Sequence, residues 1–322
     1  MLNGVDFFAG LGGVSSGWKE SGLINPLLSV EFNPAFPGLS SAYQNVHKNN
    51  FPDGKFLKIL IQNWVKLGFP GLARNEIFIA HGSPPCQNFS QATRGMANRP
   101  IESELDFICA DAYATFLLAF LPSYFTLEQV PEYQKSISFE AFYKRVSLFY
   151  NIQIYRINLM HFGIPQDRVR LFVVGNRFHK QALSLPTYKQ HQGWFSTLQG
   201  LSLQSTTLTT KQQRIAQAKG HKILLLPRVG KCDFKTAKMH YEPYPTLLRS
   251  YFTDQNNSNR YEPFSCLVNG LPYRVPLRAL ARGQGFFDSF VLPSQPVIAG
   301  SGIGNAFSPK FIHDFIIENF KK

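Results

Sequence analysis

One cysteine of this chain stands where a thiol could act on a bound substrate. Cys86 follows an apolar run at residues 77–80 and lies in the segment Gly-Ser-Pro-Pro-Cys-Gln-Asn-Phe-Ser, residues 82–90. The two prolines stiffen a loop that presents the thiol beyond the end of a strand. Cys109, by contrast, lies among apolar residues on a helical face, as a structural cysteine does. Because thiolates are good nucleophiles, Cys86 is a candidate for covalent catalysis.

A glycine-rich turn near the N-terminus is a candidate cofactor loop. Residues 6–13 read Asp-Phe-Phe-Ala-Gly-Leu-Gly-Gly, between an apolar run and a helical pattern. Glycines at such a turn allow the backbone to approach a ligand closely. Glu31 ends the next apolar run, where Rossmann-like folds bind ribose hydroxyls. Such turns are common, and a plain surface acid is the alternative interpretation of Glu31.

Taken in order along the chain, these segments resemble the conserved blocks of the DNA (cytosine-5) methyltransferases. Residues 127–130, Leu-Glu-Gln-Val, resemble the family's Glu-Asn-Val. Residues 163–170, Gly-Ile-Pro-Gln-Asp-Arg-Val-Arg, resemble its Gly-x-Pro-Gln-x-Arg-x-Arg. The six matching blocks are residues 8–13, 85–87, 127–130, 163–170, 285–286 and 304–306. They span both ends of the chain and leave out its middle, where this family has its variable target-recognition domain.

The resemblance implies methyl transfer from S-adenosylmethionine to carbon 5 of cytosine. Carbon 5 is a poor nucleophile, and adding a thiolate to carbon 6 raises its electron density; the resemblance assigns this attack to Cys86. Glu128 would hydrogen-bond ring nitrogen 3 and the exocyclic amine. Arg170 would contact the carbonyl oxygen, and Arg168 would help to position the base or a phosphate. Because a stacked base is out of reach, base flipping is implied.

The same resemblance implies a cofactor site for S-adenosylmethionine and no metal. The expected cofactor-binding residues are Phe8, Ala9, Gly10, Leu11, Gly12, Glu31, Phe32, Pro85 and Asn305. Four positions depart from the family pattern. Lys58 stands about where an adenine-binding aspartate is expected, Gln129 replaces an asparagine, Ala279 replaces the acid of an Arg-Glu pair, and Phe307 replaces a more frequent valine.

Strands alternating with helical patterns predict an α/β fold with a mostly parallel, Rossmann-like sheet. The expected strands are residues 5–8, 27–31, 77–80, 124–130, 155–159 and 171–174. Helical spacing is expected at 103–121 and again at 302–320. In such sheets ligands bind at the carboxyl ends of the strands, where the cofactor and nucleophile loops stand.

Charge separates the middle of the chain from the rest. The net charge is +13, and residues 177–241 hold eleven Lys and Arg against one acid, Asp233. A basic block beside a near-neutral body favours a phosphate-binding surface, although a solvated basic face is the plain alternative. We therefore expect a catalytic domain at 1–176, a smaller basic target-recognition domain at 177–273, and a C-terminal segment at 274–322 that packs back on the catalytic domain.

Composition narrows the class of protein further. No apolar run is long enough to span a membrane, and the first residues do not look like a secretory signal. The four scattered cysteines form no zinc spacing and favour a reducing, cytoplasmic setting, nucleoid-associated if the source is prokaryotic. The expected partner is double-stranded DNA, with a separate restriction endonuclease as a potential companion and a monomer as the default state.

Three functional alternatives remain open on the sequence. The first is a DNA (cytosine-5) methyltransferase, solitary or in a restriction-modification system. The second is a tRNA cytosine-5 methyltransferase, since the basic block suits either polyanion. The third is a DNA-binding homologue with weak or no turnover, which the complete set Cys86, Glu128 and Arg170 argues against. An amino-methyltransferase is disfavoured because no Asp/Asn-Pro-Pro-Tyr block is present.

Overall fold

The computed structural model describes residues 1–34, 36–73, 76–86, 88–89, 102–178, 180–228, 233–252 and 263–321. Gln87 and Ser90 of the nucleophile loop, and Cys232, lie outside these residues. The chain divides into two compact units. Unit 1 comprises residues 1–158, 169–186 and 312–322, and unit 2 comprises residues 159–168 and 187–311.

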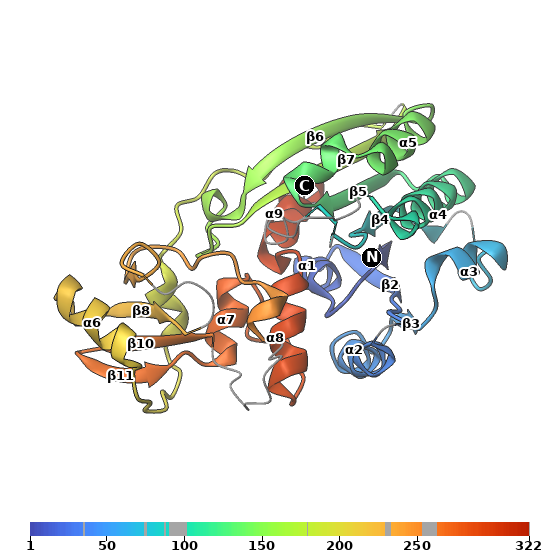
Figure 1. Cartoon of the computed structure of the whole chain (residues 1–322). Helices are drawn as coiled ribbons and strands as arrows, with labels where there is room; N and C mark the ends of the chain where they lie inside the picture. The colour runs from blue at the N-terminus through green and yellow to red at the C-terminus, as the bar shows by residue number, and fades with distance from the viewer. Residues whose placement is uncertain are drawn as a thin grey trace. The chain divides into compact units, whose positions relative to one another are not determined.

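Unit 1 is built on a seven-stranded sheet in its described part, with strand order β3-β2-β1-β4-β5-β7-β6 (Figure 1). Its strands are β1 (Leu2–Phe7), β2 (Ile24–Val30), β3 (Lys55–Leu57), β4 (Ile79–Gly82), β5 (Tyr124–Gln129), β6 (Tyr150–Asn158) and β7 (Val169–Arg177). The first five strands in this order, β3, β2, β1, β4 and β5, pair in parallel. Strand β7 is antiparallel to both of its neighbours, β5 and β6. The expected mostly parallel α/β sheet is confirmed.

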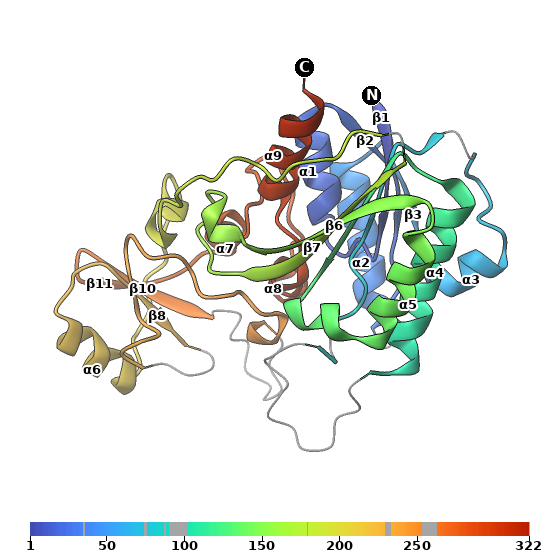
Figure 2. The same ribbon diagram turned by 90° about the horizontal axis from the view of Figure 1, so that it is seen from above.

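Helices cover both faces of this sheet because its side chains alternate between two buried surfaces. Phe7 packs on Phe116 of α4 with ring centroids 4.5 Å apart, whereas its neighbour Asp6 bonds Ser15 of α1 on the other face. Figure 2 shows α4 and α5 on one side and α1 on the other. The helices of unit 1 are α1 (Gly13–Ser21), α2 (Pro37–Asn50), α3 (Ile61–Lys66), α4 (Glu104–Phe120), α5 (Ile137–Val146) and most of α9 (Pro309–Phe320).

Unit 2 has a smaller four-stranded sheet in its described part, in the order β11-β10-β8-β9, with antiparallel pairings. Its elements are α6 (Thr210–Lys219), β8 (Leu224–Pro227), β9 (Lys238–Met239), β10 (Phe264–Val268), β11 (Leu271–Arg274), α7 (Leu277–Gly283) and α8 (Pro296–Asn305). Helix α6 buries Ile215 against Leu224 and Leu226 of β8. A capping box of Thr209 and Gln212 fixes where α6 begins.

Most expected elements of unit 1 are present, with boundaries that differ by a few residues. Helix α4 begins after Ser103, which caps it in a capping box, and ends at Phe120, close to the expected 103–121. The short strand β3 was not expected, and the expected helical stretch 302–320 contains the end of α8 and then α9, which follows after a break at residues 306–308. The compact units also differ from the expected ranges. Residues 159–168 and 274–311 group with unit 2, whereas residues 177–186 and 312–322 group with unit 1.

Candidate active site

The nucleophile loop leaves β4 at the carboxyl edge of the sheet and is held there by Gln129. The Gln129 amide Nε2 donates to the carbonyl oxygens of Pro84, at 2.7 Å, and Pro85, at 3.2 Å. Its Oε1 accepts from the backbone N–H of Val130 at 2.7 Å, and the side chain is 2% exposed. Both prolines lie beyond the end of β4, so this amide supplies hydrogen bonds that the sheet does not provide there. The longer amide therefore supports the loop.

The far side of the loop is tied to the start of α4. Asn88 Nδ2 donates to Asp106 Oδ2 at 2.6 Å and to Ser103 Oγ at 3.0 Å. The same Asp106 carboxylate also accepts from the Ser103 N–H of the helix cap. The sequence analysis did not identify Asn88, although an amide two residues after the nucleophile was a usable signal. The loop is thus anchored to two elements of unit 1.

The environments of the described cysteines separate one reactive candidate from two structural ones. Cys86 is partly exposed, whereas Cys109 and Cys266 are buried, and none of the three is in a disulfide. Burial raises the pKa of the Cys109 and Cys266 thiols to about 12, which keeps them protonated. Cys86 is therefore the described thiol that a substrate could reach.

Glu128 and Arg170 form an ion pair next to the nucleophile loop. Arg170 Nε lies 2.8 Å from Glu128 Oε1, and the two side chains are only 12% and 8% exposed. Glu128 is on β5, next to the Gln129 that holds the loop, and Arg170 is on β7, which pairs with β5. The sheet therefore brings Cys86, Glu128 and Arg170 to one edge of unit 1. A carboxylate with fixed orientation in a site of low exposure is suited to hydrogen-bonding a polar heterocycle.

Arg168 lies in unit 2 and is 2% exposed. Its guanidinium donates to the backbone oxygens of Leu247, at 3.1 Å, Gly304, at 3.2 Å, and Ala306, at 3.3 Å. These bonds join three separate segments of unit 2. Although Arg168 and Arg170 are two residues apart, they have different environments, and the sequence alone gave no sign of this.

The cofactor loop is a left-handed turn that needs glycine. Gly10 and Gly12 have φ of 51° and 95°, and a Cβ on Gly12 would lie 2.9 Å from the Phe51 ring. Phe8 also has a positive φ, 58°, an unusual conformation for a phenylalanine that is typical of ligand-contacting turns. His47 of α2, which the sequence analysis missed, contacts the Gly10 carbonyl through Nε2 at 3.1 Å.

Glu31 is positioned next to this loop. Its Oε2 accepts from the Gly10 N–H at 3.2 Å. Burial raises the pKa of Glu31, and the Gly10 hydrogen bond opposes that rise. An acid at the end of β2 beside a close-approach turn fits the ribose hydroxyls and the adenosyl part of S-adenosylmethionine. The residues of this loop therefore fit the cofactor that the family resemblance implies.

The remaining predicted cofactor residues fall into two groups. Ala9, Leu11, Phe32 and Pro85 lie in or beside the loops of unit 1, and Leu11 is 1% exposed. Asn305 ends α8 in unit 2 and is exposed.

Two of the departures from the family pattern have defined environments: Lys58 donates through Nζ to Ser41 Oγ at 3.2 Å, and Ala279 is fully buried in α7. Its position in the core gives a reason why an acid would be costly there.

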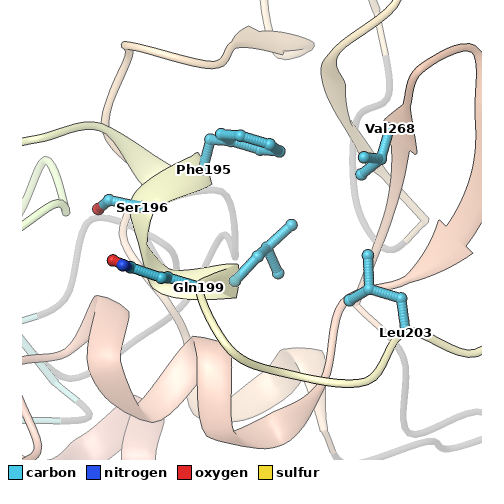
Figure 3. A pocket seen from close by; sticks show the side chains of 6 residues that line it. Phe195, Ser196, Gln199, Leu203 and Val268 are labelled. Carbon is cyan, nitrogen blue, oxygen red and sulfur yellow. The ribbon is translucent and has the colours of Figure 1, made fainter.

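A hollow in unit 2 does not have the character of a reaction site. It has a volume of about 450 Å³ and is lined by Phe195, Ser196, Leu198, Gln199, Leu203 and Val268. Figure 3 shows the side chains of Phe195, Leu203 and Val268 around the open space. None of the lining residues is titratable or a strong nucleophile.

Within the described residues no cluster of metal ligands is found, and no described helix is long and apolar enough to cross a membrane.

The fold of unit 1 is Rossmann-like, with a mostly parallel sheet covered by helices. The chain belongs to the C-5 cytosine-specific DNA methylase family, whose model matches residues 2–322. The family resemblance read from the sequence is confirmed.

Individual relatives agree with this family. The chain is 24% identical over 330 residues to the type II methyltransferase M1.HphI of Haemophilus parahaemolyticus, covering 96% of this chain and 84% of that protein. It is 26% identical over 199 residues to M.XorII of Xanthomonas oryzae, covering 59% of this chain but only 43% of that protein. A solved E. coli prophage protein, described as a DNA modification methyltransferase, superposes with a TM-score of 0.68 at 20% identity, covering 98% and 97% of the two chains.

Proposed function

We propose that this chain is an S-adenosylmethionine-dependent DNA (cytosine-5) methyltransferase that acts on a flipped cytosine in duplex DNA through a covalent bond to Cys86. The observation that carries the proposal is the arrangement at one sheet edge. The accessible thiol of Cys86 is in a loop braced by Gln129, and Glu128, the residue before that brace on β5, is paired with Arg170 of β7. The similarity to type II methyltransferases supports a role in a restriction-modification system.

The side chains of Cys86, Glu128 and Arg170 act on different atoms of the cytosine ring in the proposed reaction. The Cys86 thiolate adds to carbon 6 of cytosine, and the ring electrons move toward carbon 5. Glu128 hydrogen-bonds ring nitrogen 3 and the exocyclic amine, so that charge developing on the ring is offset. Arg170 holds the Glu128 carboxylate and reaches toward the carbonyl oxygen of the base. After transfer, water is the proposed acceptor of the carbon 5 proton, and Cys86 leaves as the double bond re-forms.

The cofactor loop and Arg168 prepare the site. S-adenosylmethionine supplies an electrophilic methyl group on a sulfonium. Residues 8–12 and Glu31 would hold its adenosyl part, with Phe32 and Pro85 beside it; a role for Asn305 stays a prediction of the family resemblance. For Arg168 we propose a bracing role, since its guanidinium is bonded to three backbone carbonyls within unit 2. The basic residues of 177–241 are the proposed contacts to DNA phosphates.

The test combines methyl transfer with covalent trapping. The purified chain is incubated with tritiated S-adenosylmethionine and either a mixed duplex DNA or tRNA, as wild type and as Cys86→Ala. Label on DNA that disappears in Cys86→Ala is expected. Cys266→Ala, which removes a buried thiol of unit 2, is the matched control and should keep the label.

A second readout detects the covalent step itself. Duplex DNA carrying 5-fluorocytosine in place of cytosine should become irreversibly bound to the wild type in the presence of the cofactor, and never to Cys86→Ala. Label on tRNA alone would show that RNA is the substrate. DNA binding without label or adduct, over a library that includes all short target sequences, would refute the proposed activity.

A further inference from the structure

A buried histidine of β4 is hydrogen-bonded on both ring nitrogens. His81 is 0% exposed, and its backbone pairs in register with Thr126 of β5. Nδ1 lies 2.7 Å from Thr126 Oγ1, and Nε2 lies 2.7 Å from Ser83 Oγ. Ser83 Oγ in turn donates to Glu128 Oε2 at 3.3 Å. Thr126, His81, Ser83 and Glu128 therefore form one continuous chain of hydrogen bonds in unit 1.

The direction of this chain follows from counting hydrogens. Burial lowers the pKa of His81 to about 3, so the ring is neutral and has one N–H donor and one acceptor nitrogen. The Ser83 hydroxyl has a single hydrogen and gives it to Glu128, which as a carboxylate can only accept. Ser83 must then accept from His81 Nε2–H, and His81 Nδ1 must accept from the Thr126 hydroxyl. Every donor in the chain points toward Glu128.

The two oxygens of Glu128 are consequently held from two different strands. Oε2 accepts from Ser83, which follows β4, and Oε1 accepts from Arg170 of β7. Two fixed contacts on opposite oxygens define the plane of the carboxylate, and each oxygen keeps a second lone pair for a ligand. Small errors in the orientation of such a group are costly to a reaction that depends on it.

We propose that His81 is a positioning residue for Glu128, acting through the hydroxyl of Ser83 to fix the plane in which the carboxylate meets the cytosine ring. The proposal rests on the proposed function of Glu128. In this role, His81 contacts neither the substrate nor the cofactor. The imidazole ring orients the Ser83 hydroxyl. Because Ser83 Oγ accepts a hydrogen bond from His81 Nε2–H, its own hydrogen is directed to Glu128.

The experiment uses a pair of substitutions that resemble opposite ends of the imidazole. A glutamine amide reaches about as far as Nε2, whereas an asparagine amide reaches about as far as Nδ1. His81→Gln keeps a donor for Ser83, and His81→Asn keeps only the contact with Thr126. The third variant is Ser83→Ala, which removes one hydroxyl from a partly exposed position and leaves the histidine in place.

The rate of covalent attachment to 5-fluorocytosine DNA is measured in a single turnover with saturating cofactor. Losing one hydrogen bond to a charged group predicts a rate about tenfold lower for Ser83→Ala and His81→Asn. For His81→Gln we expect a rate within about threefold of the wild type. The dissociation constants for cofactor and DNA should stay unchanged in all three variants, since only the orientation of Glu128 is altered.

The double variant Ser83→Ala with His81→Asn separates positioning from general damage. If His81 acts through Ser83, the second substitution adds no further loss, whereas independent effects would multiply to about a hundredfold. Equal losses in His81→Gln and His81→Asn, or multiplying losses in the double variant, would overturn the proposal. A wild type that forms no adduct would instead count against the proposed function. Thermal unfolding midpoints identify any variant whose loss reflects misfolding, and Ser83→Ala then carries the test.

Discussion

Replacing Gln129 with methionine tests whether the nucleophile loop depends on a side-chain amide. Methionine has nearly the same volume, so the substitution leaves no large cavity, but it removes three hydrogen bonds at once. Each such bond contributes about 1 kcal/mol net. The Pro85 carbonyl lies at a partly exposed residue and can bind water in compensation, so we expect a loss of about 2–3 kcal/mol.

This energy should appear in the covalent step as well as in stability. If the loop must be restored to its braced geometry before Cys86 reacts, about 2–3 kcal/mol corresponds to an adduct rate about 30- to 150-fold lower. The assay is single-turnover attachment to 5-fluorocytosine DNA, combined with urea unfolding. Gln134→Met is the matched control, since Gln134 is exposed five residues further along the same segment and should be neutral in both measurements.

Two results would refute this reasoning about Gln129. An adduct rate within about twofold of the wild type, in a variant whose stability has fallen by the expected amount, would show that the brace is structural only. Unchanged rate and unchanged stability would show that water replaces the amide. Either result would remove Gln129 from the account of how the thiol is presented.

Three further predictions concern charge and buried polar groups. Burial raises the pKa of Asp6 to about 7, so its contribution to stability is present at low pH and lost as the pH rises toward 7; the advantage of Asp6→Asn over wild type in urea unfolding should grow by about 2–4 kcal/mol between about pH 4 and pH 8, and a constant difference would contradict this. Arg168→Met should cost about 3–5 kcal/mol in the same assay, because three carbonyl oxygens of unit 2 each lose one hydrogen bond, although that of Ala306 keeps a second donor, Gln284 Nε2; a cost below about 1 kcal/mol would show that they find other partners. DNA affinity should fall by on the order of 10³ between roughly 50 and 200 mM salt if the basic residues of 177–241 bind phosphates, and a flat response would remove that segment from the interface.

The sequence was sufficient to predict the elements whose signals are local. Strand β5 and helix α4 were expected nearly at their observed bounds because an apolar run and apolar residues at helical spacing mark them directly. The three-residue strand β3 has too few residues for any period to be recognised. The break between α8 and α9 was missed because helical spacing continues across residues 306–308.

The candidate site was predictable where chemistry and position coincide in one short segment. Cys86 and Glu128 belong to such segments. The environment of Arg168 was not predictable, because its partners Leu247, Gly304 and Ala306 lie far away in the chain. The compact units differ from the expected ranges for the same reason, since residues 159–168 group with unit 2 through contacts such as that of Asp167 N–H with the Tyr244 carbonyl.

The substitution of glutamine for asparagine at residue 129 connects these observations. On the sequence it was a departure from the family pattern, and in the structure its extra length is used to reach two consecutive proline carbonyls. His81 of the neighbouring strand β4 and Ser83, which follows that strand, form a second set of contacts that ends on Glu128. Side chains from β4 and β5 thus brace each other in both directions: β5 supports the loop that follows β4, and β4 supports the acid on β5. A change in either strand should therefore disturb the thiol and the acid together, and variants at Gln129 and Ser83 should show coupled rather than independent effects on the adduct rate.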